Sequence, residues 1–269
     1  LPPLPWPPPV DEFPTATVKS YLLDEKLAYG NTRYLYEQLI DDGNTDEVVQ
    51  EIEASWPQDA WELRGYLLAK SPYLSVKVLK EMVEKNIMPA AMVTEVLVAN
   101  PEATRQDRFL DWIQQSHHPL PEYMLNLVVA SWDQRTYRAT LENELTQHHS
   151  AMVQSGNMLL HHYADLPYAS NDSIVIPTDS VLWVWQQLRT PSARYAEAMI
   201  LIEGNQFQAA TIVIENIPVE HNLKAPEALE RQRMLDLITF MGTLVNNGKN
   251  EMQLDQGEVQ SLKNMMGTA

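Results

Sequence analysis

Apolar residues recur along most of the chain at the three-and-four spacing of an amphipathic helix. From Thr17 onward, glycine and proline fall between these periodic segments rather than inside them. The segment from Pro57 to Lys70 is typical, because Ala60, Leu63 and Leu67 would line one buried face. The pattern predicts a succession of short helices separated by tight turns.

The stretch from residue 71 to residue 131 contains two blocks that align with each other. Each block opens near a proline, Pro72 or Pro101, and continues as a helix to a second proline, Pro89 or Pro121, where another helix begins. Proline suits the first turn of a helix because its missing N–H would have no intrahelical partner there. Each block is therefore predicted to form a helical hairpin that must stack on a neighbour to bury its second face.

The helical periodicity continues beyond this repeated region. Residues 134–163 are predicted to form one or two long helices, with Gly156 and Asn157 as the possible interruption. Residues 165–178 are rich in Pro, Ser, Asn and Asp and predict a loop, in which residues 173–176 are the only strand-like run. Further helical segments are expected at 179–188, 191–216, 226–246 and 257–266.

The segment 191–216 is predicted to be another hairpin, with its turn at Gly204. The small side chains of Ala198 and Ala209 would let its two helices approach closely, and Ile212 and Ile214 are expected to point inward. The full tetratricopeptide signature is absent.

The first 14 residues hold seven of the 18 prolines and predict an extended polyproline II arm. Two roles are left open for this arm. Leu4 and Trp6 would contact a partner if the arm is a proline-rich ligand, whereas they would pack on their own domain if it is a spacer. The spacer is the favoured interpretation.

The fold class that follows is all-α, with helical-hairpin repeats forming an α-solenoid-like array of about a dozen helices behind a Pro-rich N-terminal arm. Whether the helical regions make one domain or two is left open. The predicted ranges are 1–16 for the arm, 17–164 for the helical-repeat region, 165–178 for the loop, and 179–269 for the C-terminal helical-hairpin region.

Charge and composition narrow the classes of partner. The sequence has 36 acidic and 19 basic residues, and its formal net charge of -17 would repel a nucleic-acid backbone. No stretch approaches the roughly 20 apolar residues that a spanning helix needs, so no membrane insertion is expected. The absence of cysteine excludes disulfides, thiolate catalysis and cysteine-bound metals.

Two histidine pairs on the long helical segment are the candidate metal ligands. They are His148 and His149, and His161 and His162. Thirteen residues of helix correspond to about 20 Å, so one ion could use both pairs only if the chain reversed near Gly156. The favoured interpretation is that these histidines are ordinary polar positions, and no cofactor is expected.

No motif indicates catalysis. The sequence lacks a Gly-x-Ser-x-Gly elbow, a phosphate-binding loop and a dinucleotide fingerprint. The acidic turn from Asp41 to Glu47 has the oxygen ligands of a calcium site but not the alternation of an EF-hand loop. Gly43 and Thr45 are better explained as helix-capping residues. The chain is therefore not expected to be an enzyme.

Two further tryptophans, Trp183 and Trp185, are candidate contacts for a protein partner. They lie two positions apart on a short predicted helix and so point in different directions. One of them is expected to be exposed and to anchor a partner.

Several segments resemble a helical region near the C-terminus of very large secreted Bacteroidota proteins that commonly end in a type IX secretion sorting domain. The similarity is clearest over residues 63–144 and continues more loosely to residue 241. The segments that carry it are Leu63 to Leu68, Ser71 to Ser75, Met88-Pro89, Val98 to Pro101 and Pro121 to Met124. The resemblance implies a cell-surface or extracellular location. No β-rich sorting domain occurs in the sequence, so the chain is expected to be a processed piece or an excised domain.

The function expected from these patterns is a noncatalytic structural or protein-interaction scaffold, which works through a protein partner or through self-assembly. The alternative is a secreted metal-binding protein or hydrolase that uses the two histidine pairs.

Overall fold

A computed structural model describes residues 15–106, 108–164, 178–249 and 251–265. Within these ranges the ordered elements are helices and there is no strand, which confirms the all-α prediction for this part of the chain. Residues 1–14 of the predicted Pro-rich arm, including Leu4 and Trp6, lie outside the described residues. The strand-like run at 173–176 also lies outside them. Thr15 and Ala16, the last two residues of the predicted arm, instead begin a helix.

The chain divides into two compact units. The first unit comprises residues 25–150, and the second comprises residues 1–24 with 151–269. Two long helices, α1 (Thr15–Leu39) and α9 (Tyr137–Ala164), contribute residues to both units. This division differs from the predicted ranges because it falls inside these two helices rather than at a loop.

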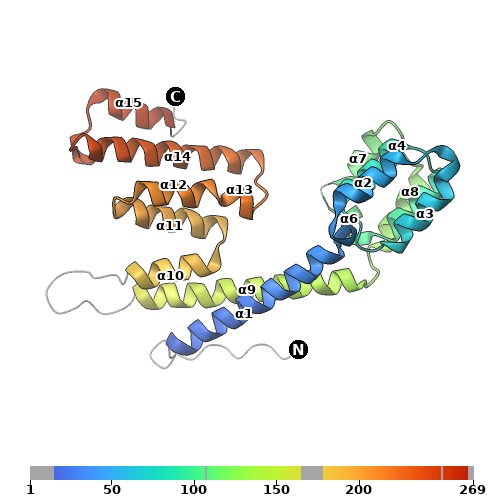
Figure 1. The fold of residues 1–269 in the computed structure, drawn as a ribbon, viewed down its shortest axis with the longest axis horizontal. Helices are drawn as coiled ribbons and strands as arrows, with labels where there is room; N and C mark the ends of the chain where they lie inside the picture. The colour runs from blue at the N-terminus through green and yellow to red at the C-terminus, as the bar shows by residue number, and fades with distance from the viewer. Residues whose placement is uncertain (1–14, 107, 165–177, 250, 266–269) are drawn as a thin grey trace. The chain divides into compact units, whose positions relative to one another are not determined.

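The first unit contains a series of short helices (Figure 1). Helix α2 packs on α4, while α3 packs on α5 and α5 packs on α8. Helices of one hairpin therefore contact helices of the next hairpin. The elements are η2 (Ile40–Gly43), α2 (Thr45–Ala54), η3 (Pro57–Asp59), α3 (Ala60–Ala69), α4 (Val76–Lys85), α5 (Ala90–Val98), α6 (Pro101–Thr104), α7 (Phe109–Gln115) and α8 (Glu122–Ser131).

One apolar core runs through these hairpins. On α4 the buried residues are Val78, Leu79, Met82 and Val83, which form one face at helical spacing. Phe109 of α7 belongs to the same core. Because successive hairpins share this core, none of them buries its apolar face alone.

Local capping residues set where several of these helices begin and end. Pro89 and Pro121 are the N-cap residues of α5 and α8 and have nearly the same backbone angles, in agreement with the predicted equivalence of the two blocks. Gly43 has a φ of 75°, as its predicted capping role requires. The N-cap of α2 is Asn44, whose side chain accepts the backbone N–H of Glu47, rather than Thr45.

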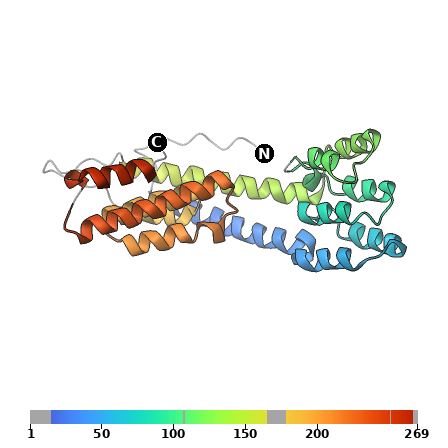
Figure 2. The same ribbon diagram turned by 90° about the horizontal axis from the view of Figure 1, so that it is seen from above.

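The second unit stacks its helices in chain order (Figures 1 and 2). Helix α10 packs on α11, α11 on α12, α12 on α14, and α14 on α15. The bounds are α10 (Thr178–Leu188), α11 (Pro191–Glu203), α12 (Phe207–Glu215), α13 (Ile217–Glu220), α14 (Ala225–Asn246), η4 (Glu251–Gln253) and α15 (Gln256–Met265). None of the helices among the described residues is long and apolar enough to cross a membrane.

The predicted hairpin at 191–216 is present, with one change in its inward face. Ala198 and Ile214 are buried as predicted, and Ala210 lies with Ile214 on the buried face of α12. Ile212 was predicted to be inward and is exposed. Two residues correspond to a rotation of about 200° on a helix, so Ile212 must lie opposite Ala210 and Ile214.

Gly156 does not interrupt α9, which is continuous from Tyr137 to Ala164. Its role is close packing within its unit. A Cβ atom at position 156 would lie 2.8 Å from one methyl carbon of Leu188 and 2.9 Å from the other. Glycine is needed at this position because α10 brings Leu188 directly against the backbone of α9.

We therefore expect Gly156→Ala to lower the free energy of unfolding by about 1–3 kcal/mol, as overpacking typically does. Gly242→Ala is the matched control in the same unit, because its Cβ would make an ordinary 3.5 Å contact with Phe207. Urea unfolding of both variants tests the idea. Equal stability of Gly156→Ala and the wild-type chain would contradict it.

Candidate functional site

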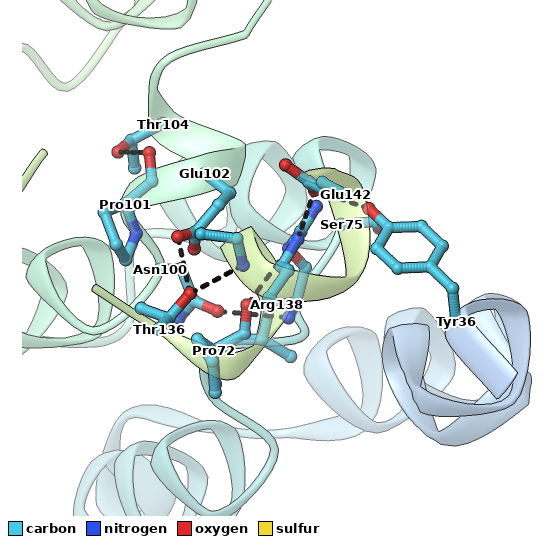
Figure 3. Close-up of polar contacts among 12 residues, drawn as sticks. Tyr36, Pro72, Ser75, Asn100, Pro101, Glu102, Thr104, Thr136, Arg138 and Glu142 are labelled. Carbon is cyan, nitrogen blue, oxygen red and sulfur yellow. Dashed lines mark hydrogen bonds and ion pairs between the residues drawn. The ribbon is translucent and has the colours of Figure 1, made fainter. Parts of the chain in front are cut away.

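Polar side chains from distant parts of the sequence gather around the turn at residues 71–75 in the first unit (Figure 3). This turn connects α3 to α4. Three buried side chains, Asp41, Asn100 and Arg138, reach it from three different places in the chain. We refer to these three residues as the turn clamp.

Arg138, on the first turn of α9, supplies the positive charge of the turn clamp. Its Nη1 donates to the carbonyl oxygens of Pro72 and Leu74 at 3.0 and 2.9 Å. Its Nε donates to a carboxylate oxygen of Glu142 at 3.0 Å. The side chain is only 3% exposed. A buried guanidinium is tolerated here because a carboxylate and two carbonyl groups accept its hydrogen bonds.

Tyr36 of α1 completes the surroundings of this guanidinium. Its hydroxyl donates to Glu142 at 2.7 Å, and its ring centroid lies 5.9 Å from the guanidinium carbon of Arg138. Burial raises the pKa of Tyr36 to about 12, although the nearby Arg138 opposes that shift. Tyr36 is therefore a neutral hydrogen-bond donor at neutral pH, not a base.

Asn100 binds the same turn from the other side. Its Oδ1 accepts the backbone N–H of Leu74 at 3.0 Å. Its Nδ2 donates to the hydroxyl of Ser71 and to the carbonyl of Val96, both at 2.8 Å. The side chain is fully buried and both ends of its amide are paired, so its orientation is set by its surroundings.

Asp41 holds the start of α4. Its backbone N–H donates to the carbonyl of Tyr73 at 3.0 Å, and its carboxylate accepts the N–H of Ser75 at 2.8 Å and the hydroxyl of Thr45 at 2.7 Å. Asp41 and Asp42 both adopt left-handed backbone angles. The acidic turn therefore uses its first carboxylate within the fold.

Glu102 carries the least satisfied polar atom of the group. One of its carboxylate oxygens accepts the hydroxyl of Thr136, while Oε2 is buried and has no hydrogen-bond partner among the described residues. Thr104 of α6 makes a second contact of this kind, since its hydroxyl accepts the indole N–H of Trp132 at 3.0 Å. These bonds tie α6 to the segment between α8 and α9.

The arrangement is suited to holding a turn rather than to chemistry. Each member of the turn clamp is engaged by backbone groups or by a neighbouring side chain. Over the ranges that the structure describes, no three His, Asp or Glu side chains are placed to hold a metal ion. The three residues of the turn clamp thus offer neither a free base beside a nucleophile nor a set of metal ligands.

The histidine pairs make separate contacts. In the first unit, His148 Nδ1 lies 2.6 Å from a carboxylate oxygen of Glu25, and the ring of His149 lies 5.9 Å from that of Tyr29. His161 and His162 belong to the other unit. Because α9 continues through Gly156, the chain reversal that a shared site would need is not present.

Trp183 and Trp185, the predicted partner contacts, are both partly buried on α10. The ammonium of Lys19 lies 5.2 Å from the ring centroid of Trp183 and 5.7 Å from that of Tyr163. The strongly exposed tryptophans are Trp56 and Trp61, which the sequence pattern did not single out.

The hollows in the first unit are open to solvent. One of about 310 Å³ is lined by Val83, Glu84, Ser116, His117 and His118. Both histidines are exposed, and the hydroxyl of Ser116 donates to the carbonyl of Ile113. The serine is thereby engaged by the backbone and is not activated by a base.

The second unit contains its own ion-pair network, in which Arg194 and Glu197 are largely buried and Arg189 is 54% exposed. The guanidinium of Arg194 donates to Glu197 at 2.7 Å and also to Glu220, which in turn accepts Arg189. Burial alone would raise the pKa of Glu220, but hydrogen bonds from Arg194 and Arg189 outweigh it and lower that pKa. This network joins α11 to α13.

Replacement of Arg138 tests the energetic weight of the turn clamp. Arg138→Met keeps the apolar stem but leaves the carbonyls of Pro72 and Leu74 without this donor and leaves Glu142 with only the hydroxyl of Tyr36, so we expect a loss of about 2–3 kcal/mol in unfolding free energy. Arg33→Met is the control, since its ion pair with Glu37 is exposed and worth under about 0.5 kcal/mol. Chemical denaturation of both variants would show whether the two losses differ, and equal losses would refute a special role for Arg138.

Asn100→Asp adds a pH test of the same turn. A new carboxylate here would face the carbonyl of Val96, and burial would raise its pKa in the folded state above its unfolded value. The variant should therefore be most stable at pH values below the pKa that the new carboxyl has in the unfolded chain. Its stability should fall as the pH rises through the pKa of the same carboxyl in the folded chain. Urea unfolding at about pH 5 and about pH 8, relative to the wild-type chain, measures this. A pH-independent difference would contradict it.

Comparison with known proteins assigns no role to these residues. The chain matches no known protein family, no curated protein and no solved structure. A function for this chain therefore rests on the geometry of the helices and their surfaces.

Proposed function

We propose that the chain is a noncatalytic scaffold, built as an α-solenoid-like array of helical hairpins, that binds a protein partner. The observation that carries this proposal is the similar sequence separation of polar contacts between successive hairpins. It is a physical consequence of hairpins of similar length stacked side by side.

In the first unit, polar contacts join residues about one hairpin apart. Lys77 binds Asp46 at 2.7 Å across a separation of 31 residues, and Arg64 binds Glu95 across the same separation. Asn100 reaches Ser71 across 29 residues, and Trp132 reaches Thr104 across 28. The spacing agrees with the two aligned blocks of the sequence.

The second unit repeats this spacing. Arg189 pairs with Glu220 across 31 residues, and the ring of His221 contacts the carbonyl of Arg189 across 32 residues at 2.8 Å. This single junction has a separation similar to those in the first unit, which supports the same construction from hairpins. Extended binding surfaces are commonly made in this way.

Trp56 and Trp61 are the best candidates for the contact with the partner. Large exposed aromatic side chains are frequent anchors in protein interfaces. The guanidinium carbon of Arg64 already lies 5.7 Å from the Trp61 ring centroid, and the carboxylates of Asp59 and Glu62 are close in sequence. Aromatic rings next to carboxylates favour basic side chains, so we propose a partner with a basic surface.

The proposed setting is a cell-surface or extracellular assembly. It rests on the sequence resemblance to secreted Bacteroidota proteins, and the net charge of -17 agrees with a basic partner. The metal-binding or hydrolase alternative gains no support from the geometry, because His148 and His149 contact Glu25 and Tyr29 instead of a shared ion site.

A double variant, Trp56→Ser with Trp61→Ser, tests the proposed contact. Both side chains are exposed, so stability should change by less than about 0.5 kcal/mol. The measurement is chemical cross-linking of the chain in extracts of its native source, with mass spectrometry to identify the cross-linked protein. We expect the wild-type chain to be cross-linked to a basic partner, less strongly as the salt concentration is raised, and we expect the variant to lose this cross-link.

Val219→Ser is the matched control, since Val219 is an exposed apolar residue of the other unit. Partner cross-linking should be unchanged in this variant. Retention of the same partner by the double tryptophan variant would overturn the proposed contact.

A further inference from the structure

A second hollow of the first unit, of about 210 Å³, is formed by α2, η3 and α3. Three carboxylates, those of Glu51, Asp59 and Glu62, line it together with the side chains of Leu63 and Tyr66. These residues come from the same stretch of the chain as the two exposed tryptophans. We call this feature the α2–α3 hollow.

The negative charge of the α2–α3 hollow is not neutralised by the described part of the chain. None of the described residues that line it is basic. Within the described ranges, the carboxylates of Glu51 and Glu62 have no ion pair and accept no hydrogen bond. The basic side chains of this region, Arg64 and Lys70, are paired with acidic residues outside the hollow. Because a hollow lined by charges of one sign concentrates the opposite charge, its occupant is expected to be a cation.

The size of the hollow and the placement of its carboxylates indicate what kind of cation fits. No three His, Asp or Glu side chains in the described ranges are placed to hold a metal ion, so the carboxylates of the hollow do not converge on one ion. Its volume of about 210 Å³ is also below the roughly 300–1,000 Å³ of pockets that take small-molecule ligands. A single basic side chain lies between these two limits, because its charged head can reach separated carboxylates.

The chemistry of the lining favours arginine over lysine. Leu63 and Tyr66 offer apolar surface against which the aliphatic stem of a basic side chain can pack. A guanidinium is planar, presents five N–H donors in fixed directions and stacks on aromatic rings, so it can bind two carboxylates at once. An ammonium is a compact and strongly hydrated point charge that lacks this geometry.

We propose that the α2–α3 hollow binds an arginine side chain of the basic partner. The inference rests on the proposed function and deepens it, since it names the residue by which the partner is recognised. The two exposed tryptophans supply apolar contact area, while the three carboxylates of the hollow select a guanidinium at one position of the partner.

The first test titrates the full chain with three end-blocked peptides and follows its backbone NMR resonances. The peptides are Ala-Arg-Ala, Ala-Lys-Ala and Ala-citrulline-Ala, in which citrulline is the uncharged analogue of arginine. The arginine peptide should shift resonances of residues 51–66 with a dissociation constant of about 1 mM or weaker, the lysine peptide should bind several-fold more weakly, and the citrulline peptide should cause no shift. Equal binding of the lysine or citrulline peptide, or no shift with the arginine peptide at about 10 mM, would overturn the proposal.

A double variant, Glu51→Gln with Glu62→Gln, removes two of the charges and keeps the shape of the hollow. Both side chains are exposed, so the variant should fold as the wild-type chain does. Its affinity for the arginine peptide should fall about 5–20-fold, as expected for the loss of two exposed ion pairs. Glu84→Gln, in the 310 Å³ hollow of the same unit, is the matched control and should bind the peptide like the wild-type chain. Unchanged affinity of the double variant would refute the α2–α3 hollow as the arginine site.

Failure of this inference and failure of the proposed function are distinguishable. A basic partner that is lost in the double tryptophan variant but kept by the double glutamine variant would remove only the arginine site. Binding of the arginine peptide at residues 51–66, with no basic partner cross-linked to the chain, would leave the arginine site and remove the proposed function of the tryptophans.

Discussion

The backbone of the 71–75 turn imposes the most demanding requirement in the first unit. Buried N–H and C=O groups must find partners, and those of a turn cannot pair with one another as they do inside a helix. Here the carbonyls of Pro72 and Leu74 are bound by Arg138, and the N–H groups of Leu74 and Ser75 are bound by Asn100 and Asp41. The turn is thus held by side chains from other parts of the chain.

This dependence links local structure to the stacking of hairpins. Asp41 and Asn100 belong to the turns on either side of 71–75, so satisfying one turn positions its two neighbours. Apolar contacts alone would be less specific, because residues such as Leu79 or Val96 can slide against another apolar surface at little cost. Hydrogen bonds with fixed directions set the register of the stack.

A surface built in this way can be varied without loss of the fold. The turn clamp and the core carry the packing, and the outward positions of the helices are left free to differ. That freedom explains how equivalent outward positions hold Ala91 and Glu95 on α5 but Tyr123 and Leu127 on α8. It also explains why two tryptophans can be exposed on a well-packed hairpin. The function that we propose likewise depends on these outward positions rather than on a buried centre.

The helical class, the two aligned blocks and many of the inward residues could be predicted from the sequence, because apolar periodicity and proline at the first turn of a helix are local signals. The same signals have a limit: Leu79 on α4 follows the spacing and is buried, whereas Ile212 on α12 was expected to be inward and is exposed. The turn clamp could not be found in this way, since Arg138 and Leu74 lie 64 residues apart. Likewise, only packing against α10 revealed why Gly156 has no side chain. These features depend on which distant groups meet once the helices pack, and no local pattern encodes that.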